Sequence, residues 1–246
     1  DTRAIEHGIW PVRILEDTRP QTLTERMAAL HVPGVSVAVI RRGRIAWARG
    51  WGVRDSERCT PMDADTILQA ASISKPVFAA LVMRLSDMGE LDVDADVDSY
   101  LRRWHLPAAP AVSAAPITLG QLLTHTAGLT LHGFPGYAPD ERIPDLAEIL
   151  GGEPIPRAYL SMVPPGTTRA DGLVREAAPG ARWQYSGGGY LLAQMAVEDR
   201  LGQPLEQLAQ RLIFRPLRMR HSSFAQPAPA ALVAQAASGH AEAGRL

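Results

Sequence analysis

Ser72 and Lys75 are residues whose types and spacing could do chemistry. They lie three positions apart in Ser72-Ile73-Ser74-Lys75, a spacing that places both side chains on one face of a helix. A serine hydroxyl becomes a good nucleophile when a neighbouring base removes its proton, and a neutral lysine amine can act as that base. Lys75 is the only lysine among the 25 Lys and Arg residues. Because arginine cannot give up its proton in a protein, acid–base chemistry by a cationic side chain is expected at Lys75.

The residues around Lys75 must form a helix for this pairing to work. Apolar side chains recur every three or four positions from Ser74 to Met88, which predicts an amphipathic helix of about four turns. Pro76 falls in its first turn, where the missing N–H costs nothing, and Gly89 follows its end. Ser72 is therefore expected at the helix start, where burial and the positive end of the helix dipole would both favour a neutral amine.

A candidate proton carrier, Tyr185, comes later in the chain. It precedes the run Ser186-Gly187-Gly188-Gly189, which is predicted to open into a helix from Tyr190 to Leu201. A phenol can pass a proton between a nucleophile and a leaving group when nearby cations stabilise its phenolate. A single tyrosine is more often a packing residue, but its combination with Ser72 and Lys75 makes Tyr185 a catalytic candidate.

The remaining sequence predicts the elements that position these residues. Two β-rich runs, 35–40 and 45–53, flank Arg41-Arg42-Gly43-Arg44 and predict a β-hairpin. Apolar periodicity with N-cap and breaker residues predicts further helices over 22–30, 118–125, 146–150 and 204–213. Between 131 and 180 the chain is rich in Pro and Gly outside that short helix, which is typical of site-forming loops.

Composition and spacing exclude several other classes of protein. The net charge of -1 and an apolar fraction of 46% predict a globular protein that has no nucleic-acid partner. No apolar run approaches the roughly 18 residues of a membrane span. The single Cys59 and seven His without H-x-x-x-H spacing predict no metal site, and no cofactor is expected. No G-x-S-x-G elbow of an α/β-hydrolase occurs.

Together the motifs resemble the serine β-lactamase and penicillin-binding-protein family, whose signature includes S-x-x-K. The similarity is to the branch related to class C β-lactamases, which includes D-alanyl-D-alanine carboxypeptidases and esterases. It spans nearly the whole chain in family order. The matching segments are Val32–Val39, Gln69–Lys75, Leu122–Leu129, the Tyr185 segment and Arg215–Met219.

The resemblance implies roles for particular residues. Ser72 would be the acylated nucleophile, with its backbone N–H as half of an oxyanion hole. Lys75 would activate it, and Tyr185 would transfer protons to the leaving group and from the deacylating water. Gly187 and Gly188 would line the substrate site. His125-Thr126-Ala127-Gly128 is interpreted as structural, a helix end closed by Gly128.

The resemblance also implies an α+β fold: an antiparallel sheet flanked by helices, with an inserted, mostly helical region. Residues 1–60 would be the sheet region and residues 61–246 the helical region that carries the motifs. The family's late K-T-G or H-x-G strand is not found before Leu246. The C-terminal strands are therefore expected to be missing from this sequence, and to come from further residues or from a second chain. The implied location is periplasmic or secreted.

The expected function is that of a serine hydrolase acting through a Ser72 acyl-enzyme. Its substrate would be a small-molecule or peptide-like acyl compound: an ester, a peptide-like amide or a β-lactam. The family's Y-x-N motif is Tyr185-Ser186-Gly187 here, and the missing Asn side chain predicts inefficient β-lactam turnover. The alternative is a catalytically impaired penicillin-recognising or binding protein that keeps the fold.

Overall fold

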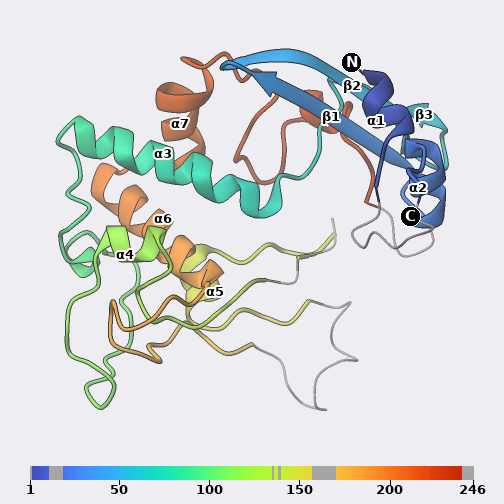
Figure 1. Cartoon of the computed structure of the whole chain (residues 1–246). Helices are drawn as coiled ribbons and strands as arrows, with labels where there is room; N and C mark the ends of the chain where they lie inside the picture. The colour runs from blue at the N-terminus through green and yellow to red at the C-terminus, as the bar shows by residue number, and fades with distance from the viewer. Residues whose placement is uncertain (1, 11–18, 135, 138–139, 157–169, 240–246) are drawn as a thin grey trace. The chain divides into compact units, whose positions relative to one another are not determined.

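The chain divides into two compact units in a computed structural model, which describes residues 2–10, 19–134, 136–137, 140–156 and 170–239. The first unit comprises Asp1–Gln69 and Ala225–Leu246, and the second comprises Ala70–Phe224 (Figure 1). The sequence-based division at residues 60 and 61 stays a prediction. The first unit continues to Gln69 and takes in the C-terminal residues.

The first unit is built on an antiparallel sheet in the order β1-β2-β3. β1 and β2 pair from Gly34 opposite Gly52 to Arg41 opposite Arg44. The two turn residues, Arg42 and Gly43, have backbone φ angles of 51° and 71°, and a type I′ hairpin turn requires positive φ at both positions. The predicted hairpin is thus confirmed. The elements of this unit are α1 (Thr2–His7), α2 (Leu23–Ala29), β1 (Gly34–Arg41), β2 (Arg44–Asp55), β3 (Thr60–Pro61) and α8 (Ala230–Val233).

The second unit is mostly helical and contains a continuous apolar core. α3 buries Phe78, Leu81, Val82 and Leu85, the i, i+3, i+4, i+7 pattern of an amphipathic helix. α6 passes through the same core and contacts α4, α5 and α7. The elements are η1 (Ala71–Ile73), α3 (Ser74–Asp87), η2 (Val97–Ser99), α4 (Leu119–Leu123), α5 (Leu146–Leu150), α6 (Gly187–Leu201), α7 (Leu205–Ala209) and η4 (Gln210–Phe214).

Three predicted helix boundaries differ from the structure. α6 begins at Gly187 rather than Tyr190, because the Ser186 side chain caps it by accepting the Gly189 N–H. The predicted helix over 204–213 is α7 followed by the wider π-helical turns of η4. α4 is shorter than predicted, since the chain leaves the helix at Thr124 and His125 has a φ of 60°.

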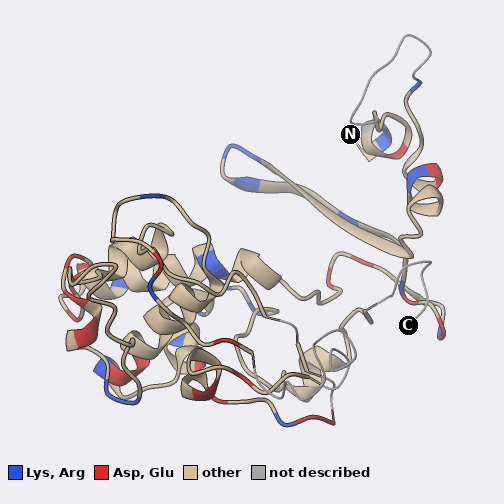
Figure 2. Ribbon diagram, turned by 90° about the horizontal axis from the view of Figure 1, so that it is seen from below, with Lys and Arg blue, Asp and Glu red and all other residues tan. Residues whose placement is uncertain are grey.

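Basic and acidic residues are interspersed along the ribbon of the described part of the second unit (Figure 2). One cluster is structural: Asp199, buried on α6, accepts the backbone N–H groups of Arg102 and Arg103. The Arg103 guanidinium also pairs with Asp199 and Glu198. These bonds satisfy a buried carboxylate and fasten the loop after η2 to α6. Among the described residues, no helix is long and apolar enough to cross a membrane.

Candidate active site

The candidate nucleophile, Ser72, lies in the short turn η1 directly before α3. The preceding residue, Ala71, has a φ of 43°, a left-handed conformation that is costly for a side chain with a Cβ and is often found at functional sites. α3 starts two residues after Ser72 with Ser74-Lys75-Pro76. The proline fits the first turn, as predicted. The exposed Ser72 is therefore held at the start of a helix that the core anchors.

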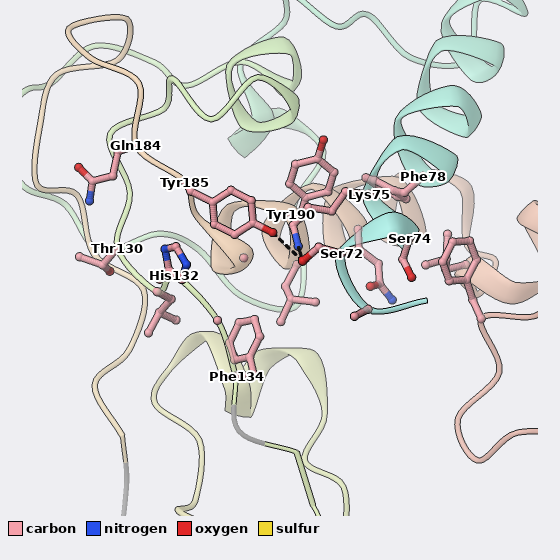
Figure 3. Close-up of a pocket in the computed structure, with 18 of the residues that line it drawn as sticks. Ser72, Ser74, Lys75, Phe78, Thr130, His132, Phe134, Gln184, Tyr185 and Tyr190 are labelled. Carbon is pink, nitrogen blue, oxygen red and sulfur yellow. Dashed lines mark hydrogen bonds between the residues drawn. The ribbon is translucent and has the colours of Figure 1, made fainter. Parts of the chain in front are cut away.

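The structure brings Ser72, Lys75 and Tyr185 together (Figure 3). The Ser72 Oγ shares a hydrogen bond of 2.7 Å with the Tyr185 Oη, and the Lys75 Nζ donates to the Ser72 Oγ at 3.3 Å. Lys75 Nζ also lies 5.0 Å from the ring centre of Tyr185 and 5.5 Å from that of Tyr190, within cation–π range. The Ser72 hydroxyl thus has two hydrogen-bond partners, Lys75 and Tyr185, that can exchange protons with it.

The phenol of Tyr185 is electrostatically biased toward ionisation. Hydrogen bonding with Lys75, hydrogen bonding with Ser72 and the positive charge of Lys75 lower the pKa of Tyr185 below its ordinary value of 10.0, against the opposing effect of burial. Tyr190 behaves oppositely, because burial and the nearby Tyr185 raise its pKa. The Tyr190 Oη donates to the Leu123 carbonyl at 2.8 Å. The two neighbouring phenols therefore differ: Tyr185 is suited to proton transfer and Tyr190 to packing.

Ser186 fixes the chain immediately after Tyr185. Its Oγ donates to the Thr130 carbonyl at 2.5 Å and accepts the Gly189 N–H at 2.8 Å. The first glycines of α6 donate their N–H groups to the carbonyls of His132 and Leu131. The start of α6 is thus hydrogen-bonded to the loop 130–132, which also forms part of the site.

The two glycines predicted to line the substrate site occupy different positions. Gly187 lines the cavity, whereas Gly188 is buried against Leu131 and Leu173. A Cβ at Gly187 would lie 2.9 Å from the His132 carbonyl oxygen, and one at Gly188 would lie 2.7 Å from a Leu173 methyl carbon. Close packing therefore favours glycine at both positions. Their part in binding substrate stays a prediction.

His125 is the residue beside the site whose position the sequence did not reveal. Interpreted above as part of a helix end, it places its ring 4.3 Å from that of Tyr185, centre to centre. His132 approaches the same phenol at 4.8 Å. Burial and the positive charge of Lys75, followed by that of His132, lower the pKa of His125 below 6.5. No local pattern could have found this contact, because Tyr185 lies far along the sequence.

A cavity of about 1060 Å³ opens beside Ser72. Its polar lining includes Ser72, Glu176 and Gln184, and the Gln184 Nε2 donates to the Glu176 carboxylate at 2.7 Å. Such a mostly apolar cavity with a few convergent polar groups is typical of a small-molecule site. Its apolar lining comprises Phe78, Leu131, Phe134, Trp183, Tyr190, Leu191, Leu205 and Phe224.

In the described part of the chain, no group of three or more His, Cys, Asp or Glu side chains is arranged to hold a metal ion. Cys59 is exposed and lies in the first unit. The hydrogen-bonded Ser72, Lys75 and Tyr185 could together perform nucleophilic attack by a hydroxyl with proton transfer by an amine and a phenol.

The fold and the Ser-x-x-Lys site define a protein of the β-lactamase and transpeptidase type. The family model described as Beta-lactamase matches residues 20–245, so the chain belongs to this family of serine hydrolases. Esterase EstB of Burkholderia gladioli is 33% identical over 85% of this chain and 50% of its own length. A beta-lactamase of Escherichia coli is 27% identical over 85% of this chain and 48% of its own length.

Solved structures agree with the family assignment. The octameric penicillin-binding protein homologue from Pyrococcus abyssi superposes with a TM-score of 0.63 at 26% identity. The match covers 89% of this chain and 46% of that one. The chain thus spans about half the length of these relatives, and the expected α+β, β-lactamase-like fold is confirmed.

Proposed function

We propose that this protein hydrolyses esters with an apolar acyl group through a covalent Ser72 acyl-enzyme. The observation that carries the proposal is the hydrogen-bonded set of Ser72, Lys75 and Tyr185 at a largely apolar cavity. A nucleophile with a base in hydrogen-bond reach, and a second group to return the proton, is the arrangement that acyl transfer needs.

Acylation uses all three side chains. The Ser72 Oγ–H proton passes to Lys75 Nζ, acting as a neutral amine, while Oγ bonds to the ester carbonyl carbon. The bond from that carbon to the alkoxy oxygen then breaks. The leaving oxygen takes a proton from Tyr185, which recovers it from the Lys75 ammonium. The hydrogen bonds of Ser72 with both partners, at 2.7 Å to Tyr185 and 3.3 Å to Lys75, support this path.

Deacylation reverses the roles of the same groups. Tyr185, ionised by passing its proton to the Lys75 amine, removes a proton from water, the hydroxide adds to the acyl carbon, and the Oγ–carbon bond breaks as Ser72 takes a proton from the Lys75 ammonium. The Ser72 backbone N–H would supply one donor to the oxyanion. We assign the second oxyanion donor to residues outside this sequence, in the same polypeptide or in a second chain. We also propose that the whole protein is periplasmic or secreted.

An ester is favoured over a β-lactam by the environment of Gly187. The family's Y-x-N motif has an Asn at the position of Gly187, and the side-chain amide of that Asn would hydrogen-bond an amide group in the acyl part of a substrate. In this chain the space beyond Gly187 is occupied by the His132 carbonyl oxygen, 2.9 Å from a built Cβ, and by the Phe134 ring at 3.2 Å. An ester lacks the amide N–H that such a side chain would recognise. The similarity to an esterase supports the same choice.

The alternative is a penicillin-recognising protein that is acylated but not turned over. It would keep Ser72 and Lys75 and fail at deacylation. Similarity to the penicillin-binding protein homologue is the observation that favours it. It predicts a stoichiometric burst of product and then no further release.

A paired substrate assay separates these functions. The full-length protein is given a nitrophenyl ester and a chromogenic cephalosporin, with Ser72→Ala as the matched control. Our proposal predicts sustained ester turnover that the control lacks, and much slower cephalosporin turnover. A single stoichiometric burst would instead support the binding protein, and equal rates for wild type and Ser72→Ala would contradict both.

A further inference from the structure

His125 holds both chain neighbours of Tyr185. Its carbonyl oxygen accepts the Gln184 backbone N–H at 2.8 Å, and its ring Nδ1 accepts the Ser186 backbone N–H at 3.1 Å. Its ring also lies against the Tyr185 ring at 4.3 Å, with an angle of 31° between the planes. Of these contacts, the hydrogen bond to Nδ1 depends on the protonation state of the His125 ring.

The Nδ1 bond fixes the chemical state of the ring. A backbone N–H can only donate, so Nδ1 must present a lone pair, and the proton of neutral His125 resides on Nε2. A second proton at Nδ1 would remove the acceptor and leave the Ser186 N–H without its partner. The groups facing the ring are Lys75 from α3, His132 from the same loop, Tyr185, and Tyr190 from α6. A positive charge on Lys75 or on His132 would oppose a second proton on this ring.

We propose that His125 is a positioning residue for Tyr185: as a neutral ring protonated on Nε2, it holds the Ser186 N–H and keeps the phenol beside Ser72. Protonation of His125 at acidic pH releases this bond and loosens Tyr185. His125 is not among the residues that line the described cavity, so it acts through Tyr185. The kinetic consequences rest on the ester hydrolysis proposed above.

Three substitutions separate the acceptor from the ring and from backbone strain. His125 has a φ of 60°, which Asn and Gly tolerate better than other residues. His125→Asn keeps an acceptor oxygen and loses the titration. His125→Gly, its matched control, suits the backbone but has no acceptor, and His125→Phe keeps an aromatic ring without one.

The expected result in the full-length protein is a loss of kcat for the Gly and Phe variants with little change in KM. A misplaced proton-transfer group costs about 10- to 100-fold, and Asn should restore most of that loss. Protonation of Lys75 lowers kcat in acid in every variant, so protonation of His125 should add a second loss of wild-type kcat below pH 6.5. The Asn variant should lack this additional loss. Equal kcat in the Asn and Gly variants, or an unchanged acid limb in the Asn variant, would overturn the proposal.

A second measurement does not depend on turnover. Two-bond ¹H–¹⁵N NMR correlations of the His125 ring should show a bare Nδ1 and a protonated Nε2 at neutral pH, with titration below pH 6.5. A protonated Nδ1 at neutral pH would overturn the proposal even if esters are hydrolysed. If wild-type protein hydrolyses no ester, the proposed function fails. The NMR result then still tests the proposed state of His125. The ultraviolet titration of Tyr185 should also differ between the Gly variant and wild type, and the Asn variant should resemble wild type.

Discussion

The two units of the chain differ most in how they bury apolar side chains. Among the described residues of the first unit, Leu23 and Met62 are the buried hydrophobic ones. The second unit contains the whole continuous core that runs through α3, α4, α6, α7 and η4. The strands of the first unit instead leave Ile40 and Ile45 about 70% exposed. Burial of apolar surface is the main favourable contribution to the free energy of folding. Most of the folding stability of the described chain is therefore expected to come from the second unit.

The three candidate catalytic residues all lie in the well-packed unit. Ser72 and Lys75 lie at the start of α3, and Tyr185 precedes α6. A core packed this densely limits the movement of the helices that carry these groups. The difference between the units teaches that the helical core can position these groups without a contribution from the packing of the first unit.

The largest predicted effect is on the chemistry of the second unit. Lys75→Arg retains a positive charge but removes the only amine that can act as a base. General acid–base groups contribute about 100- to 10,000-fold, so kcat/KM for a nitrophenyl ester should fall by that much. A free energy of unfolding within about 1 kcal/mol of wild type would show that the fold is kept. Activity within threefold of wild type would contradict the role of Lys75.

A core substitution in the second unit should have the largest effect on stability. Leu192 on α6 is fully buried in the core, and truncating such a leucine costs about 2–5 kcal/mol through lost transfer energy and the cavity left behind. Chemical denaturation of Leu192→Ala measures the change. A loss below 1 kcal/mol would mean that the core of this unit is less important than its burial indicates.

The site within this unit should also be visible by its ionisation. Because the folded-state pKa of Tyr185 is lowered, the phenol should ionise below pH 10, before the raised Tyr190. The linked stabilisation is fully present above pH 10 and is lost as the pH falls through the lowered value. The difference in ultraviolet titration between wild type and Tyr185→Phe isolates this step. Ionisation of Tyr185 at or above pH 10 would contradict the electrostatic account.

The smallest effect is expected in the first unit. Ile45 lies on β2 next to the hairpin turn and is 69% exposed. Ile45→Ala should therefore change the free energy of unfolding by less than about 1 kcal/mol, since exposed strand positions contribute mainly through β propensity. The same denaturation assay applies. A loss as large as that of Leu192→Ala would mean that the strands are covered in solution and would remove the contrast between the units.

Much of this organisation could be predicted because it is local. The hairpin follows from two β-rich runs around Arg42-Gly43, and α3 follows from apolar periodicity between Pro76 and Gly89. The pairing of Ser72 with Lys75 needs only the i, i+3 geometry of the helix start. In each case residues close in sequence determine the structure.

Contacts between distant segments could not be predicted from the residues themselves. Tyr185 was a catalytic candidate through its combination with Ser72 and Lys75, and the family resemblance implied its role. Its hydrogen bond to Ser72 requires α3 and the start of α6 to meet in the core. The segment His125–Gly128 was interpreted as a helix end closed by Gly128. The contact of the His125 ring could not be predicted, because its partner, the Ser186 N–H, is a backbone group that no pattern marks. The early start of α6 has the same origin, since the Thr130 carbonyl orients the Ser186 side chain that caps it.

Mapping a covalent adduct tests the central claim most directly. The full-length protein is treated with a fluorophosphonate, digested and analysed by mass spectrometry, with Ser72→Ala as the control. The account predicts a single stoichiometric adduct on Ser72, slowed strongly by Lys75→Arg and absent from Ser72→Ala. An unlabelled Ser72 in folded protein, or an adduct on another residue that persists in Ser72→Ala, would contradict it.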